Sequence, residues 1–108
     1  MTRETARTAL RDFKENLISA FGSETEVTLF GSTARGDYGP GSDIDVLVLL
    51  HFQPDTFTEE RIFDLAYDAE LRYGVVFGVI VYSRDFWNSE LARVMPLHKN
   101  IDREGIGV

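Results

Sequence analysis

Apolar residues recur at three- and four-residue steps through the first part of the chain. This spacing is typical of the buried face of an amphipathic helix. The residues that follow it are Leu10, Phe13, Leu17 and Phe21. Gly22 suits the residue that ends such a helix, because glycine tolerates the backbone conformation found there. The pattern predicts a helix over about residues 2–21 whose spaced apolar side chains belong to the core.

Three short apolar runs have the length and composition of β-strands. They cover residues 27–30, 44–50 and 75–82. The run at 44–50 is apolar on both faces, which indicates a central strand. A helix is predicted between the second and third runs, because Thr56 and Glu59 have the spacing of a capping box and apolar residues recur at helical spacing as far as Tyr73.

Shorter helices are expected elsewhere. Residues 32–35 could form one turn, a helix is expected over about residues 85–91, and a last helix over about residues 97–104. Together the elements predict an α+β fold, in which a small mixed sheet carries helices mainly on one face and leaves the other face open. Residues 1–108 are expected to form a single domain.

Composition narrows the classes of function. The chain has no cysteine, which excludes disulfides and thiolate chemistry. Its longest apolar run is far too short to span a bilayer, and its charged N-terminal region does not resemble a signal peptide, so we expect a cytoplasmic protein without a membrane partner. The net charge of −7 argues against nucleic acid as the direct partner and suits docking on a basic protein.

The fifteen residues from Gly31 to Asp45 carry the candidate chemistry. Gly31 and Ser32 follow a strand, where free N–H groups, a missing Cβ and a hydroxyl can receive a phosphate. Asp43 and Asp45 are two residues apart on a predicted strand, so both carboxylates would leave the same face. Adjacent carboxylates repel each other unless a cation lies between them, and Mg²⁺ binds carboxylate and phosphate oxygens. The segment therefore predicts a nucleotide-phosphate site with a metal ion.

Gly31-Ser32, ten intervening residues and Asp43-Ile44-Asp45 resemble the signature of the nucleotidyltransferase superfamily that includes DNA polymerase β. The runs Gly-Ser-Thr-Ala-Arg-Gly and Ser-Asp-Ile-Asp are similar in particular to those of minimal nucleotidyltransferase (MNT) proteins. The resemblance implies a palm-like nucleotidyltransferase fold and transfer of AMP from ATP to a hydroxyl. It also implies Mg²⁺, as one or two ions held by Asp43 and Asp45, with Gly31 and Ser32 holding the triphosphate.

In that family the MNT protein acts as antitoxin to a small helical HEPN ribonuclease toxin, and some members adenylylate a tyrosine of the toxin. The resemblance therefore implies a HEPN-type partner and an antitoxin role. A chain of this length is expected to hold no second domain for a large acceptor, which favours a partner protein over an antibiotic or a transfer RNA. The alternative is a binding module that neutralises its partner by complex formation, without catalysis.

Two further candidates for nucleotide binding each have more than one expected role. Arg35 could contact a phosphate, or it could brace the loop by pairing with Asp37 or Asp43. Ser42 could orient Asp43 through a hydrogen bond, or it could cap the turn.

The third strand departs from the family pattern. Superfamily members usually present a third carboxylate from it, whereas residues 75–81 contain no acid. Gly78 has two explanations: it admits a neighbouring core side chain, or it occupies the position that faces Asp43 and Asp45. The missing carboxylate bears directly on the choice between a two-metal enzyme and a binding module.

Overall fold

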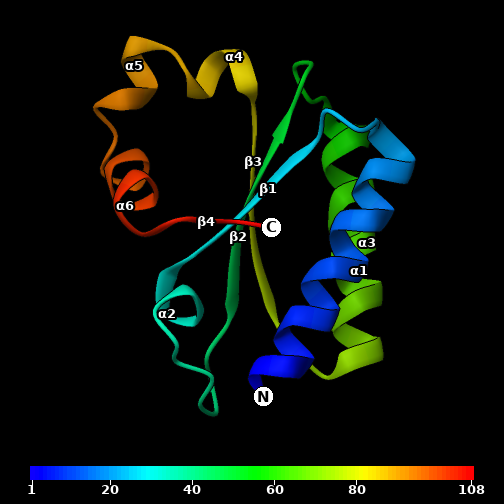
Figure 1. Ribbon diagram of the computed structural model, residues 1–108. Coiled ribbons are helices and arrows are strands. Elements are labelled where there is room, and N and C mark those ends of the chain that lie inside the picture. The colour runs from blue at the N-terminus through cyan, green and yellow to red at the C-terminus, as the bar shows by residue number, and fades with distance from the viewer.

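The computed structural model describes residues 1–108 and contains helices and strands in the predicted order (Figure 1). The elements are α1 (Arg3–Phe21), β1 (Glu26–Phe30), α2 (Gly31–Ala34), β2 (Ile44–Leu50), α3 (Thr56–Tyr73), β3 (Phe77–Ser83), α4 (Arg84–Trp87), α5 (Glu90–Arg93), α6 (Pro96–Glu104) and β4 (Ile106–Gly107). The predicted α+β class is confirmed.

The four strands form one mixed sheet in the order β3-β2-β1-β4. β1 runs antiparallel to β2 and β4, whereas β2 and β3 are parallel. Parallel neighbours need a crossover connection, and α3 supplies it. The run at 44–50 is indeed an inner strand, as its two apolar faces predicted, and it contains Asp45.

Helices α1 and α3 cover one face of the sheet, and the larger core lies between these helices and the strands (Figure 1). Even-numbered residues of β2 point into this core, because side chains alternate along a strand. Its most deeply buried side chains include Phe13, Leu17, Ile44, Val46, Val48, Leu50 and Ile62. The prediction that the spaced apolar residues of the first helix belong to the core is confirmed.

The opposite face of the sheet is only partly open, which corrects the prediction that it stays uncovered. A smaller core of Leu47, Leu49, Trp87 and Ile101 forms there. The C-terminal helices α4, α5 and α6 lie over this face toward the end of β2, whereas the beginning of β2 lies beside α2 (Figure 1). This second face, to which the odd-numbered residues of β2 point, therefore has a packed half and an accessible half. Asp45 lies in the accessible half.

Two helix boundaries differ from the prediction. Asp55 caps α3 in place of Thr56, since its carboxylate accepts the Thr58 amide at 2.8 Å and an ionised carboxylate is a strong acceptor. The helix expected over residues 85–91 is divided into α4 and α5. The Ser89 hydroxyl accepts the Ala92 amide and so begins a new helix there.

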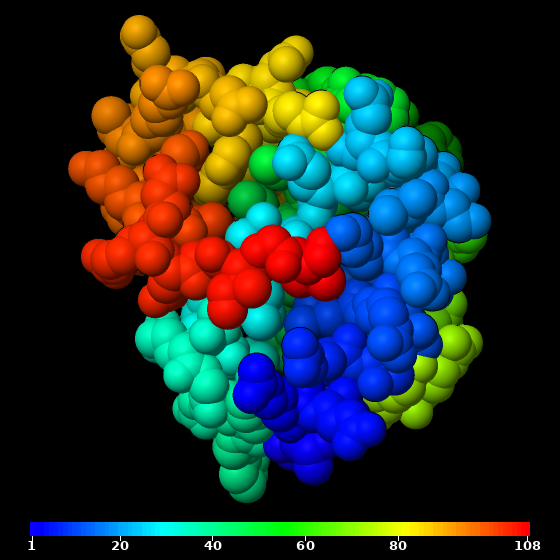
Figure 2. Space-filling model, in the orientation of Figure 1, coloured from blue at the N-terminus to red at the C-terminus, as the bar shows by residue number.

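Strand β4 was not predicted. It pairs with β1 at only two positions, and so short a strand has no alternation for a pattern to reveal. Figure 2 shows these C-terminal residues, in red, crossing the surface beside the blue residues of α1. None of the helices combines the length and the hydropathy that crossing a membrane would need.

Candidate active site

Asp45 lies between two glycines near the start of the inner strand β2. In the sheet it is paired with Phe30 of β1 on one side and with Gly78 of β3 on the other. A Cβ on Gly78 would stand 2.5 Å from Asp45 Oδ1, and a Cβ on Gly31 would stand closer still to Oδ2. Real Cβ atoms do not approach an oxygen so closely. Glycine at both positions therefore makes the room that the carboxylate occupies.

This arrangement decides between the two explanations of Gly78. The glycine admits no core side chain from the helical layer; it faces the carboxylate of Asp45. Gly31 also has a backbone φ of 75°, a conformation that favours glycine. Glycine is thus favoured at position 31 for two reasons, by its own backbone conformation and by the neighbouring carboxylate.

Asp43 lies immediately before β2 and is exposed, so it precedes the strand on which it was expected. The Thr33 hydroxyl donates to the Asp43 carbonyl oxygen at 2.8 Å, and Thr33 is buried. This hydrogen bond fixes the acid segment to the short helix α2. Thr33 was not predicted as a site residue; its one signal in the sequence is a β-branched, hydroxyl-bearing residue between the two halves of the motif.

The charges at this end of the sheet favour a cation. The pKa of Asp45 is raised above its usual value of 3.8, first because burial disfavours the charged carboxylate and second because Asp43 is nearby. Arg35 opposes this shift but does not cancel it. A cation beside Asp45 would remove the repulsion between the two carboxylates.

Arg35 forms an ion pair with the last helix. Its Nη1 lies 3.1 Å from both carboxylate oxygens of Glu104 in α6. Of the two roles left open for Arg35, pairing with Asp37 or Asp43 is not the ion pair that the structure contains. The Arg35 side chain is 59% exposed, and exposed ion pairs contribute little to stability, so a phosphate could replace Glu104 as the partner.

Ser42 lies in the glycine-rich turn, where its backbone amide donates to the Gly39 carbonyl oxygen at 3.1 Å. The Gly39 amide in turn donates to Asp37 Oδ1 at 3.0 Å, and this hydrogen bond lowers the pKa of Asp37. A position inside this turn fits the turn-capping role of Ser42. On the other side of the loop, the carbonyl of Ser32 accepts the Asp37 amide at 3.0 Å. The Ser32 side chain is partly accessible, as a phosphate ligand requires.

A model of the nucleotidyltransferase domain family matches residues 10–101, a span that includes the glycines, both acids and α3. The chain belongs to this family. A protein of Methanocaldococcus jannaschii named "Putative protein adenylyltransferase" is 36% identical to it over 98 residues, which cover 90% of this chain and 91% of that protein.

Solved structures resemble the nucleotidyltransferase domain over nearly its whole length. One, described as a "putative minimal nucleotidyltransferase", has a TM-score of 0.60 and 25% identity, and the match covers 100% of this chain and 97% of that one. A "toxin-antitoxin with AMP-PNP" has a TM-score of 0.59 and 18% identity, with 88% and 68% covered, and that likeness shows the fold alone. The predicted membership of the minimal nucleotidyltransferases and the predicted fold are confirmed.

The acid pair of this minimal nucleotidyltransferase suits a hard divalent cation. Mg²⁺ commonly takes one or two carboxylates and completes its shell with water and phosphate oxygens. Nowhere in the chain do three or more acidic or histidine residues gather in a metal-binding cluster. Asp43 and Asp45 therefore fit one ion that shares its remaining ligands with a nucleotide, and the chain offers no carboxylate cluster for two.

Proposed function

We propose that this minimal nucleotidyltransferase binds Mg²⁺ and ATP and transfers AMP to a hydroxyl of a partner protein. The observation that carries the proposal is the position of the Asp45 carboxylate between Gly31 and Gly78. Two missing side chains keep an acid accessible next to a phosphate-binding loop. A purely structural carboxylate would need no such space on both sides.

The candidate residues of the segment from Gly31 to Asp45 have different roles in the proposed reaction. Asp43 and Asp45 are the catalytic acids and the metal ligands, and the Gly31 backbone and the Ser32 hydroxyl bind the triphosphate. Arg35 leaves Glu104 to contact a phosphate, and Ser42 helps to close the turn, where its amide donates to the Gly39 carbonyl oxygen. When bound, Mg²⁺ neutralises charge that develops on the phosphate oxygens.

The transfer itself exchanges one bond for another at the α-phosphorus of ATP. The acceptor oxygen forms a bond to this phosphorus, and the bond from the phosphorus to the bridging oxygen of the β-phosphate breaks. Pyrophosphate leaves, and the proton of the acceptor hydroxyl passes to solvent. The protein contributes mainly by positioning the phosphates and the acceptor.

We propose further that residues 1–108 act as one domain in the cytoplasm and that the acceptor belongs to a small helical HEPN-type toxin, for which this chain is the antitoxin. Two similarities support this choice. A relative is named as a protein adenylyltransferase, and structural neighbours are toxin-antitoxin complexes. The net charge of −7 suits a basic partner protein.

The alternative is a binding module that neutralises the partner without transferring AMP. One observation favours it: β3 presents Gly78 and no acid beside Asp45, so a second metal ion lacks a third carboxylate. A complex in which the partner supplies that ligand would reconcile the two functions.

Calorimetric titration with ATP, with and without Mg²⁺, tests the site. We expect binding that depends on Mg²⁺ and is lost in Asp43→Asn and in Asp45→Asn; unchanged affinity in both variants would contradict the assignment. Incubation of the complex with α-³²P-ATP tests the transfer. If a complex with a HEPN protein forms and no label moves with Mg²⁺ or Mn²⁺, the binding module is correct.

A further inference from the structure

The two edges of the sheet differ in length and protection. The edge strand β4 has two residues, whereas the opposite edge strand, β3, has seven. β3 contains no charged residue and no proline, which are two of the devices that keep edge strands from pairing with another chain. An uncharged edge of this length is suited to accept a further strand.

The direction of the backbone groups in β3 follows from its contact with β2. The Val76 carbonyl accepts the Ile44 amide, so Val76 and every second residue after it point their backbone groups toward β2. Phe77, Val79 and Val81 therefore point theirs outward. The Phe77 amide is taken by Glu70 Oε2 at 2.7 Å. The amides of Val79 and Val81 are left as free donors on the outer edge.

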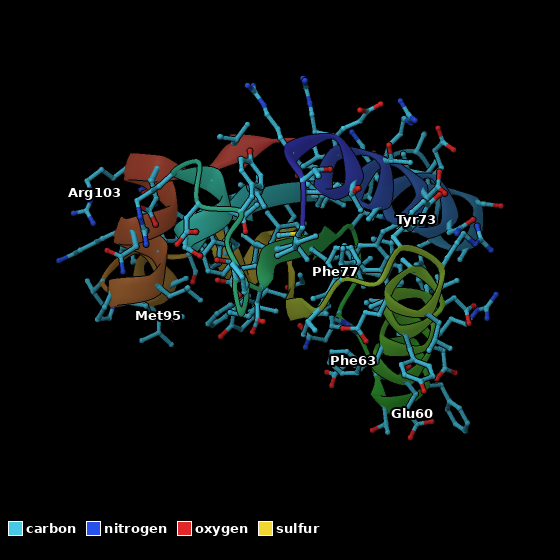
Figure 3. The ribbon with its side chains drawn as sticks, turned by 90° about the horizontal axis from the view of Figure 1, so that it is seen from below. Glu60, Phe63, Tyr73, Phe77, Met95 and Arg103 are labelled. Carbon is cyan, nitrogen blue, oxygen red and sulfur yellow. The ribbon has the colours of Figure 1, made fainter.

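One flank of α3 borders this edge. Glu70 reaches it directly, and Phe63 lies two helical turns before Glu70 on the same side of the helix. Glu59, one turn before Phe63, lines a small hollow together with Val81 and Tyr82 at the far end of β3. Figure 3 shows Phe63 projecting from α3 on the side away from α1.

The flank of α3 that follows the β3 edge thus has an acid at each end and aromatic residues between them. Phe63 is 48% exposed and Tyr67, one turn further on, is 57% exposed. The acids are Glu59 and Glu70. A second copy of this chain, paired through the same edge, would bring like charges together, which disfavours it. The surface instead complements an extended segment with apolar and basic side chains.

We infer that the outer edge of β3 receives an extended, basic segment of the partner protein as an added strand. This inference rests on the proposed function and specifies how the acceptor protein is held. Neighbouring strands lie about 4.8 Å apart, so the added strand would lie about 10 Å from β2. Gly78 puts no side chain in that interval on the face of Asp45. A long hydroxyl-bearing side chain of the added strand therefore has an open path toward the acid pair.

The test uses a seven-residue probe peptide, acetyl-Lys-Val-Lys-Tyr-Lys-Val-Lys-amide, and a matched peptide with glutamate for lysine. Amide hydrogen exchange of the full chain is followed by NMR. We expect the lysine peptide to slow exchange at Val79 and Val81 by at least about tenfold, as new backbone hydrogen bonds require. Exchange at Ile80 and Tyr82, whose amides face β2, should not change. The glutamate peptide should have no effect.

Matched variants of α3 distinguish the flank of the helix that borders the β3 edge from the rest of the helix. Phe63→Ser and Glu59→Lys should weaken the protection by the peptide, whereas Leu71→Ser and Asp68→Lys should not. Leu71 is exposed but lies away from the edge, and Asp68 is on the flank of Arg72, which pairs with Asp12 of α1. ATP titration of the same samples reports on the proposed function separately.

The outcomes are distinct. Equal effects of both variant pairs, or no slowing at Val79 and Val81 while ATP binding is intact, would overturn the edge as the docking site. In the absence of peptide, the amides of Val79 and Val81 could become more protected as the protein concentration rises. That result would show a second copy of the chain on the edge and would also overturn the inference. Loss of ATP binding alone would contradict the proposed function and leave the edge result standing.

Discussion

The buried Thr33 hydroxyl donates to the Asp43 carbonyl oxygen at 2.8 Å and so joins the two halves of the motif from Gly31 to Asp45. Removing the hydroxyl leaves the Asp43 carbonyl oxygen without this partner. We expect Thr33→Val to lower the free energy of unfolding by about 1–2 kcal/mol and to weaken binding of Mg²⁺ and ATP, because Asp43 is no longer held. Urea unfolding and calorimetry measure the two effects.

Thr33→Ser is the control, since it keeps the hydroxyl and removes only a methyl group. It should retain most of the nucleotide affinity. Equal affinity in the valine and serine variants would mean that the hydrogen bond does not position Asp43.

Removing the charge of Asp45 should stabilise the metal-free protein. Its folded-state pKa lies above the usual value of 3.8, so the folded state prefers the protonated form. This preference for the protonated form contributes fully to the free energy of unfolding below pH 3.8. The contribution is lost as the pH rises through the raised pKa. Because the carboxylate is partly screened by solvent, we expect Asp45→Asn to gain only about 0.5 kcal/mol at neutral pH.

Thermal unfolding of the wild type and of Asp45→Asn between pH 3 and pH 7, without metal, measures this difference. The variant should be the more stable protein, and its advantage in unfolding temperature should grow as the pH rises. Saturating Mg²⁺ and ATP should reverse the order, because only the wild type binds them. A constant difference across the pH range would show that Asp45 is not destabilised by its surroundings.

A side chain at Gly78 should disturb Asp45 before it disturbs the fold. The Cβ of Gly78→Ala would stand 2.5 Å from Asp45 Oδ1, and Gly31 closes the other side. We expect nucleotide affinity to fall about tenfold, equivalent to 1.4 kcal/mol of binding free energy, with intact secondary structure.

Gly78→Asp, which restores a third carboxylate, carries the same Cβ and should also bind Mg²⁺ and ATP more weakly than the wild type. Calorimetry and circular dichroism test both variants. Tighter binding by Gly78→Asp would show that the extra ligand outweighs the crowding.

The ion pair between Arg35 and Glu104 offers a double-mutant cycle. The pair is exposed on the arginine side, so its coupling should be only about 0.2–1 kcal/mol in urea unfolding. The two single substitutions should affect nucleotide binding differently. Arg35→Ala should lose affinity for ATP, whereas Glu104→Gln should keep or gain it, because Arg35 is then released. Equal losses in both variants would assign Arg35 to bracing the loop rather than to a phosphate.

The helices and strands could be predicted where burial is periodic. The run at 44–50 corresponds fully to β2, because an inner strand buries both faces and every residue of it except Asp45 is apolar. The motif of the candidate site could also be identified from the sequence, since its glycine, serine and two aspartates occur at fixed spacings in one loop. Both kinds of signal are local in sequence.

The contacts that complete the site are not local. Arg35 and Glu104 are 69 residues apart, and nothing in either neighbourhood indicates the other. The role of Gly78 depended on the register of β3 against β2, because a slip of one residue would have placed its neighbours beside Asp45 and reversed the faces. Register is fixed by the packing of whole strands, which one strand's sequence does not contain.

Trp87 is the only tryptophan of the chain, and it lies in the smaller core with its ring stacked on His98 at a centroid distance of 4.2 Å. Indole emission therefore reports on the packing of the C-terminal helices against the sheet, whereas circular dichroism is dominated by the long helices α1 and α3. If the two signals change together on heating, the halves of the molecule melt as one unit; if emission changes first, the cover over the Asp45 face loosens on its own. The fold thus contains a spectroscopic label on the side of the sheet where the nucleotide would bind.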